Sequence, residues 1–234
     1  MPVFNLPPIY KSFNMHKYMV PDIYIYISEL VRNEPTRIRK VVDYLAKNGW
    51  YYSLVSSWRY FKIAEETMNG NDVESLDEKY CEYYSSIMES KIEEISSCFP
   101  QRKLILDDSY DAHRNKKYSL SILGYISQCD GIFKELTNSE KLFSSHEKER
   151  EKIGILLREK YTNDDRNEIT SAFLFPLNNV YPHNKSGDNK PVYNRNGIMH
   201  GEITNYATEL NSLKSFSFLV FVSELKSVIS NKNK

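Results

Sequence analysis

Residues 210–229, LNSLKSFSFLVFVSELKSVI, form a strongly apolar pattern near the end of the chain. Large apolar residues recur in this stretch at roughly helical spacing: Leu210, Leu213, Phe216, Leu219, Val220, Val222, Leu225 and Ile229. Such spacing predicts a long helix with a face that packs into a core. We therefore expect this helix to organise the fold around itself.

Most of the chain before this stretch is also predicted to be helical. Periodic apolar residues, often followed by Gly, Asn or Pro, predict helices over residues 36–47, 54–68, 73–98, 101–115, 118–136, 147–161 and 166–175. In this interpretation Pro35 and Thr36 begin the first of these helices, and residues 22–31 fit either a strand or a helix. Because strand-like alternation is scarce and no internal repeat occurs, the sequence predicts an all-α helical bundle.

Pro100 is the best candidate for a boundary inside the chain. It ends a long pattern rich in glutamate and lysine, and the later apolar helices suffice for a compact bundle with the terminal helix. The interpretation divides the chain into a helical region of unknown role at residues 1–99 and a helical domain at residues 100–234.

The composition indicates no partner held by overall charge, and any nucleic-acid contact has to be local. The chain of 234 residues carries 31 basic and 31 acidic residues, so no overall charge attracts it to nucleic acid or to anionic membranes. Its three cysteines, Cys81, Cys98 and Cys129, form no CxxC pair, and the N-terminus lacks the pattern of a signal peptide. No apolar run reaches the roughly 18 residues that a membrane helix needs. We expect a soluble cytoplasmic protein without a membrane partner.

No motif for a metal or cofactor occurs in the sequence. Carboxylates and histidines lack metal-ligand spacing, and no glycine-rich phosphate loop is present. We therefore expect the chain to use neither.

Three polar residues that lie where a loop enters the terminal helix, and that are expected to open that helix, form the strongest candidate site. Arg195, Asn196 and His200 lie within the stretch NRNGIMHGE at residues 194–202. On a regular helix Asn196 and His200 share a face, whereas Arg195 points about 140° away from His200. Arg195 and His200 can therefore converge only through an irregular helix start, which Gly197 permits, or across a symmetric dimer.

These side chains suit RNA cleavage without a metal ion. Histidine changes charge near neutral pH, so His200 can take the proton from a ribose 2′-hydroxyl or protonate the leaving 5′-oxygen. Arg195 can hold the scissile phosphate, and Asn196 can orient His200 or bind a phosphate oxygen. The alternative is structural: Arg195 pairs with an acidic residue, and His200 caps or packs its helix.

The stretch 194–202 resembles the C-terminal signature of the HEPN superfamily, an Arg-polar-x3-His motif that begins with Asn-Arg and ends in His-Gly. The resemblance continues at Tyr206, Glu209, Asn211, Ser212, Leu213 and Lys214, and in the earlier segments 112–113, 118–122 and 128–131. It covers about residues 101–229. It implies a helical bundle that dimerises through the motif helix, with metal-independent endoribonuclease activity typical of toxins and phage-defence effectors. By motif position, Arg195 and His200 would be catalytic, and Asn196 would be the polar second residue. RNA would be the substrate, and an antitoxin or regulatory protein a further partner.

Four further residues are candidates for supporting or RNA-binding roles. Gln128, Asp130 and Glu202 are polar residues within the matching segments. Asp130 orients His200, pairs with Arg195, or is a solvated or helix-capping carboxylate. Tyr206 contacts a nucleotide, fixes a phosphate, or belongs to the core or the surface.

A small basic cluster lies at the turn between the helices at 101–115 and 118–136. His113, Arg114, Lys116 and Lys117 either hold an RNA backbone or form an ordinary solvated turn. The alternative to an enzyme is a non-catalytic helical module that binds RNA or another protein through the same C-terminal helix.

Overall fold

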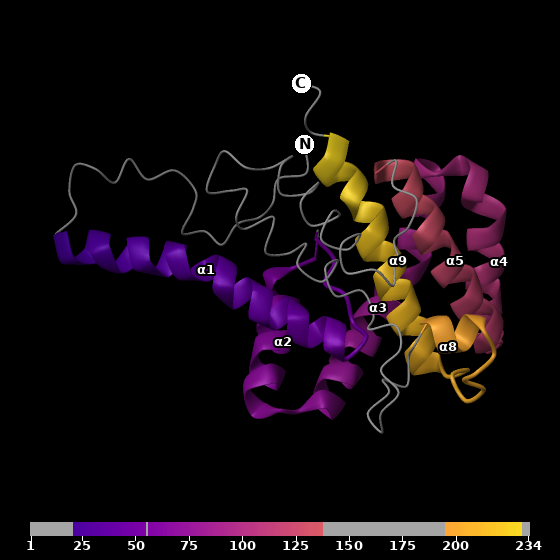
Figure 1. The fold of residues 1–234 in the computed structure, drawn as a ribbon, viewed down its shortest axis with the longest axis horizontal. Helices are drawn as coiled ribbons and strands as arrows, with labels where there is room; N and C mark the ends of the chain where they lie inside the picture. The colour runs from indigo at the N-terminus through magenta and orange to yellow at the C-terminus, as the bar shows by residue number, and fades with distance from the viewer. Residues whose placement is uncertain (1–20, 55, 138–194, 231–234) are drawn as a thin grey trace.

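The computed structural model describes residues 21–54, 56–137 and 195–230, and within these ranges all regular structure is helical (Figure 1). The elements are α1 (Pro21–Lys47), α2 (Trp58–Gly70), α3 (Val73–Cys98), the short 3-10 helix η3 (Pro100–Arg102), α4 (Lys103–Arg114), α5 (Tyr118–Thr137), α8 (Arg195–Met199) and α9 (Glu209–Ser230). The prediction of an all-α fold is confirmed for this part of the chain. The helices expected at 147–161 and 166–175 lie outside the described residues.

Helix α9 is the centre of the fold. Every residue from 211 to 222 is buried, so α9 buries its whole circumference here, whereas the sequence predicted a single apolar face. The helix packs against α5 on one side and against α3 on another (Figure 1). A helix covered all round is typical of the interior of a larger bundle.

Polar contacts along α9 show the direction of α3 beside it. Near its start, Lys214 Nζ lies 3.0 Å from Asp77 Oδ1 on α3, and near its end Lys226 Nζ donates to the carbonyl of Cys98 at 2.9 Å. These contacts show that α9 and α3 run in the same direction. α4 returns antiparallel to α3 and α5, which places the α4–α5 turn at the end of the bundle where α9 begins (Figure 1).

The connection between α1 and α2 is packed into the core. Trp50 and Tyr51 are buried. The Trp50 ring stacks on Tyr84 with centroids 5.7 Å apart, and Trp50 Nε1 donates to Asp77 Oδ1 at 2.7 Å. Tyr51 packs against Phe218 of α9 with ring centroids 4.4 Å apart.

One buried carboxylate ties this connection to two helices. Glu224 of α9 accepts hydrogen bonds from the Ser53 hydroxyl at 2.8 Å and from the Leu54 backbone N–H at 2.6 Å. Lys91 of α3 lies 3.1 Å from the same carboxylate. Burial raises the pKa of Glu224, while the charge of Lys91 opposes that rise. A buried carboxylate needs partners of this kind, because leaving it unpaired costs several kcal/mol.

The first helix is longer than the sequence predicted. α1 begins at Pro21 and continues through Pro35, which was expected to start the helix. Proline weakens a helix interior because it lacks an N–H donor. Arg37 compensates next to it: its guanidinium lies 2.8 Å from Glu34 within α1 and donates to Glu65 of α2 at 2.6 Å. The pair with Glu65 joins the segment that follows Pro35 to α2.

Buried side chains from both sides of Pro100 belong to one hydrophobic cluster, which runs from Ile38 to Leu225. Pro100 itself lies in η3, between α3 and α4. The division of the chain at this residue stays a prediction.

We expect Lys91→Ala to lower the free energy of unfolding by about 3 kcal/mol, because it leaves the buried Glu224 carboxylate without its cation. Glu94→Ala is the matched control. Glu94 pairs with the same lysine at 2.8 Å, but its side chain is 57% exposed, so its loss should cost less than about 1 kcal/mol. Urea denaturation of both variants measures the difference, and equal effects would contradict the role assigned to Glu224.

Candidate functional site

The predicted motif spans a separate five-residue helix, α8, and the residue that follows it, His200, and does not lie on the first turn of the long helix as its position had suggested. Residues 201–208 separate α8 from α9, which begins at Glu209. Thr208 caps α9, because its hydroxyl accepts from the Asn211 N–H at 3.1 Å. The side chain of Asn211 also donates to the Tyr206 carbonyl at 2.8 Å. Caps of this kind compete with helix continuation, and the polar residues before Glu209 supply them.

The end of α8 fixes the backbone around His200. Gly201 N donates to Ile198 O at 3.1 Å, Glu202 N donates to Gly197 O at 2.8 Å, and Gly201 has φ +74°. This pair of bonds with a left-handed residue is a Schellman motif, and His200 is the C-cap residue that directly follows α8. Ile198 is 4% exposed and anchors α8 to the core, whereas His200 is exposed. The motif histidine is thus presented to solvent from a fixed turn.

A buried chain of hydrogen bonds lies where α9 begins. His113 Nδ1 lies 2.8 Å from Ser212 Oγ, which lies 2.7 Å from Ser121 Oγ. Both serines are fully buried, so neither hydroxyl is accessible to a macromolecular substrate. These bonds hold the α4–α5 turn against the start of α9, at the same end of the bundle as α8 (Figure 1). Sequence reasoning missed this contact because its partners are about a hundred residues apart.

The environment of His113 favours the neutral imidazole. Burial lowers the pKa of His113, and the charge of Glu209 on α9 opposes that change. The Tyr118 ring contacts the imidazole edge-on, with centroids 5.5 Å apart. A neutral imidazole accepts at one nitrogen and donates at the other, which suits its bond to a serine hydroxyl.

The other predicted site residues do not all lie near His200. Glu202 is exposed beside His200, and Tyr206 packs, half-buried, against the core. Gln128 is buried and accepts from Arg102 Nη1 at 3.0 Å. Along α5, Gln128 lies about 10 Å from Ser121, toward the opposite end of the bundle.

Asp130 lies farther along α5 in the same direction and is half-buried. No hydrogen bond or ion pair among the described residues joins Gln128 or Asp130 to His200. Their supporting roles stay predictions. The side chains of Arg195 and Asn196 lie outside the described residues.

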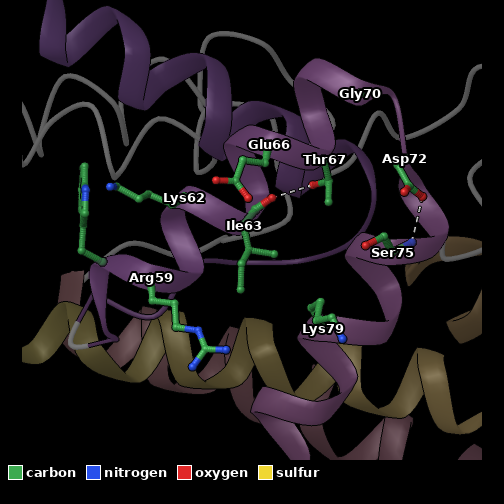
Figure 2. A pocket seen from close by; sticks show the side chains of 10 residues that line it. Arg59, Lys62, Ile63, Glu66, Thr67, Gly70, Asp72, Ser75 and Lys79 are labelled. Atoms are coloured by element: carbon green, nitrogen blue, oxygen red, sulfur yellow. Dashed lines mark hydrogen bonds between the residues drawn. The ribbon is translucent and has the colours of Figure 1, made fainter.

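A groove of about 840 Å³ lies between α2 and the start of α3 (Figure 2). Its charged lining residues are Arg59, Lys62, Glu66, Asp72 and Lys79. Asp72 already caps α3 by accepting from the Ser75 N–H at 3.0 Å. The mixed charge indicates no single class of ligand. The sequence had not indicated this groove, because its residues follow the spacing of an ordinary polar helix face.

The described ranges contain no group of three or more His, Cys, Asp or Glu side chains placed to hold a metal ion. In the same ranges, none of the helices combines the length and apolar character required to cross a membrane. No protein-family model matches this chain, and no curated protein or solved structure is significantly similar to it.

We expect Gly201→Ala to destabilise the protein by about 1 kcal/mol, because an L side chain strains the left-handed conformation. Steric clash contributes nothing, since a Cβ at Gly201 meets no atom within 4 Å. Gly70→Ala is the matched control: Gly70 is equally open but ends α2 without a positive φ. Urea denaturation should show Gly70→Ala to be neutral or stabilising. A similar loss of stability in both variants would refute the role of the left-handed conformation at Gly201.

We expect His113 to make stability depend on pH. A pKa lowered by folding means that the unfolded chain binds the proton more readily, so stability falls as pH drops below roughly 6.5. His113→Gln keeps a hydrogen-bonding side chain and removes the titration. Between pH 7.5 and pH 5.5, the unfolding free energy of the wild type should fall by more than that of His113→Gln. A difference independent of pH would contradict this expectation.

Proposed function

We propose that this chain is a metal-independent endoribonuclease, which cleaves RNA to leave a 2′,3′-cyclic phosphate. One observation supports the proposal beyond the sequence motif: His200 directly follows a helix anchored by buried Ile198, its backbone is fixed by the turn at Gly201, and its side chain is exposed. An exposed histidine on a fixed backbone is accessible to a large substrate, which general acid–base catalysis on RNA needs.

The reaction needs a base, an acid and a group that stabilises negative charge. In the proposed mechanism the 2′-hydroxyl loses its proton to a base, O2′ forms a bond to phosphorus, and the bond from phosphorus to O5′ breaks as O5′ gains a proton. His200 acts as the base or as the acid. Arg195 stabilises the charge on the phosphate oxygens, and Asn196 orients His200 or binds one of those oxygens. The 2′-hydroxyl requirement makes the reaction specific for RNA.

The proposal includes a homodimer through the end of the bundle that carries α8. Two apolar side chains at this end are exposed: Met199, beside His200, is 43% exposed, and Leu120, beside Ser121, is 57% exposed. Apposed copies of this end would cover such side chains and bring two motifs together. A role as a toxin or antiphage effector, restrained by an antitoxin or regulatory protein, follows from the same resemblance and belongs to the proposal.

The test is incubation of the purified protein with total RNA in EDTA, followed by end-group analysis. We expect cleavage that leaves 2′,3′-cyclic phosphates, and we expect His200→Ala and Arg195→Ala to reduce the rate by at least about 100-fold. Glu94→Ala, on the remote surface of α3, should cleave like the wild type. Undiminished cleavage by both motif variants would disprove the proposed site. Binding of RNA without any cleavage would favour a non-catalytic module.

A further inference from the structure

Four described residues outside the usual backbone regions share one structural role. Gly49, Asn71, Lys116 and Gly201 all have positive φ, and each follows the end of a helix in a Schellman motif: α1, α2, α4 and α8 respectively. Glycine and asparagine are the residues that ordinarily occupy this position. Lys116, with φ +58°, is the exception.

A lysine in this conformation costs stability, because its Cβ crowds the backbone where glycine has none. The hydrogen bonds of the turn enforce the conformation: Lys116 N donates to His113 O at 2.9 Å, and Lys117 N donates to Ala112 O at 2.8 Å. Strain that the surrounding structure maintains is a sign of a functional role for the side chain. At Lys116, that side chain is an exposed cation.

The two neighbouring cations of the turn are also exposed. Arg114 and Lys117 flank Lys116, and no ion pair within the described ranges includes any of the three. By contrast, Lys103 at the other end of α4 pairs with Asp107 at 2.8 Å. The Arg114 guanidinium lies 5.7 Å from the centre of the Tyr110 ring, which restricts where its charge lies. We call Arg114, Lys116 and Lys117 the basic turn.

The basic turn lies at the end of the bundle that carries the motif. His113 directly precedes it and contacts Ser212 at 2.8 Å, so the turn sits beside the start of α9. α8, which His200 directly follows, precedes that start and lies at the same end of the helices (Figure 1). Since the whole chain has equal numbers of acidic and basic residues, nucleic-acid binding requires a local cluster such as this one.

We propose that the basic turn binds the phosphate backbone of single-stranded RNA and holds the strand beside His200. The inference rests on the proposed function and adds a binding surface for its substrate. Contacts to phosphates carry no sequence information, so the turn positions the strand without selecting its bases. A lysine at the strained position places a third charge between Arg114 and Lys117.

The decisive variant is Lys116→Gly, in which stability and binding should change independently. Glycine relieves the strain, so the urea concentration at the midpoint of unfolding should equal or exceed that of the protein with Lys116. Binding is measured on a His200→Ala background, by fluorescence anisotropy of a labelled single-stranded RNA over a range of salt concentrations. Loss of one phosphate contact should weaken binding and reduce the steepness of log K against log salt by about 0.7. Lys116→Asn, also tolerated in this conformation, provides a second variant with the same expectation.

The triple variant Arg114→Gln, Lys116→Gly, Lys117→Gln should reduce the salt slope by about 2 in total. Lys40→Gln, an exposed lysine on α1, is the matched control and should change neither affinity nor slope. Unchanged affinity and salt slope in the triple variant would overturn the inference, even if the wild type cleaves RNA. The inference would also be overturned if the His200→Ala protein bound no RNA at low salt. Weakened binding by a protein that never cleaves RNA would support the inference while refuting the proposed activity.

Discussion

Burial of α9 on all sides, from residue 211 to residue 222, is the constraint on which the rest of the structure depends. A helix without a solvent face must find a partner inside the protein for every polar side chain it carries. Ser212 meets His113, Lys214 meets Asp77, and Glu224 meets Lys91 together with the connection before α2. Through these contacts α3, α4 and residues 48–54 pack around α9, so the polar residues of α9 define which segments surround it.

The same constraint positions the candidate site. The contact between Ser212 and His113 brings the α4–α5 turn to the start of α9, and the capped loop before Glu209 leads back to α8. A basic turn and an exposed histidine are therefore held at one end of the bundle by buried contacts. The helices before them, α4 and α8, both end in a Schellman motif, which fixes the backbone at each of the two sites.

Within the described ranges, local patterns predicted most of the helical segments but not all of their ends and interruptions. Residues 73–98 were predicted as one helix and α3 has these bounds, because its apolar period is regular and Pro100 follows. Pro35 misled the prediction, since the ion pairs that support it involve Glu65 on another helix. The break between α8 and α9 was missed although Gly201 was visible, because the apolar pattern alone does not show where the preceding turn closes. The conformation of Lys116 could not be predicted at all, since lysine has no preference for it.

The contacts between the first connection and α9 also bear on how the chain folds. Tyr51 N is bonded to Ser217 across 166 residues, and Ser53 to Glu224 across 171. Helical proteins usually fold fast because their contacts are local, and distant contacts of this kind slow the search. During synthesis, Trp50 can pack on Tyr84 soon after α3 emerges, but Tyr51 emerges long before its partner Phe218 on α9. This part of the core can close only when α9 has left the ribosome, so the nascent chain exposes Tyr51 until then.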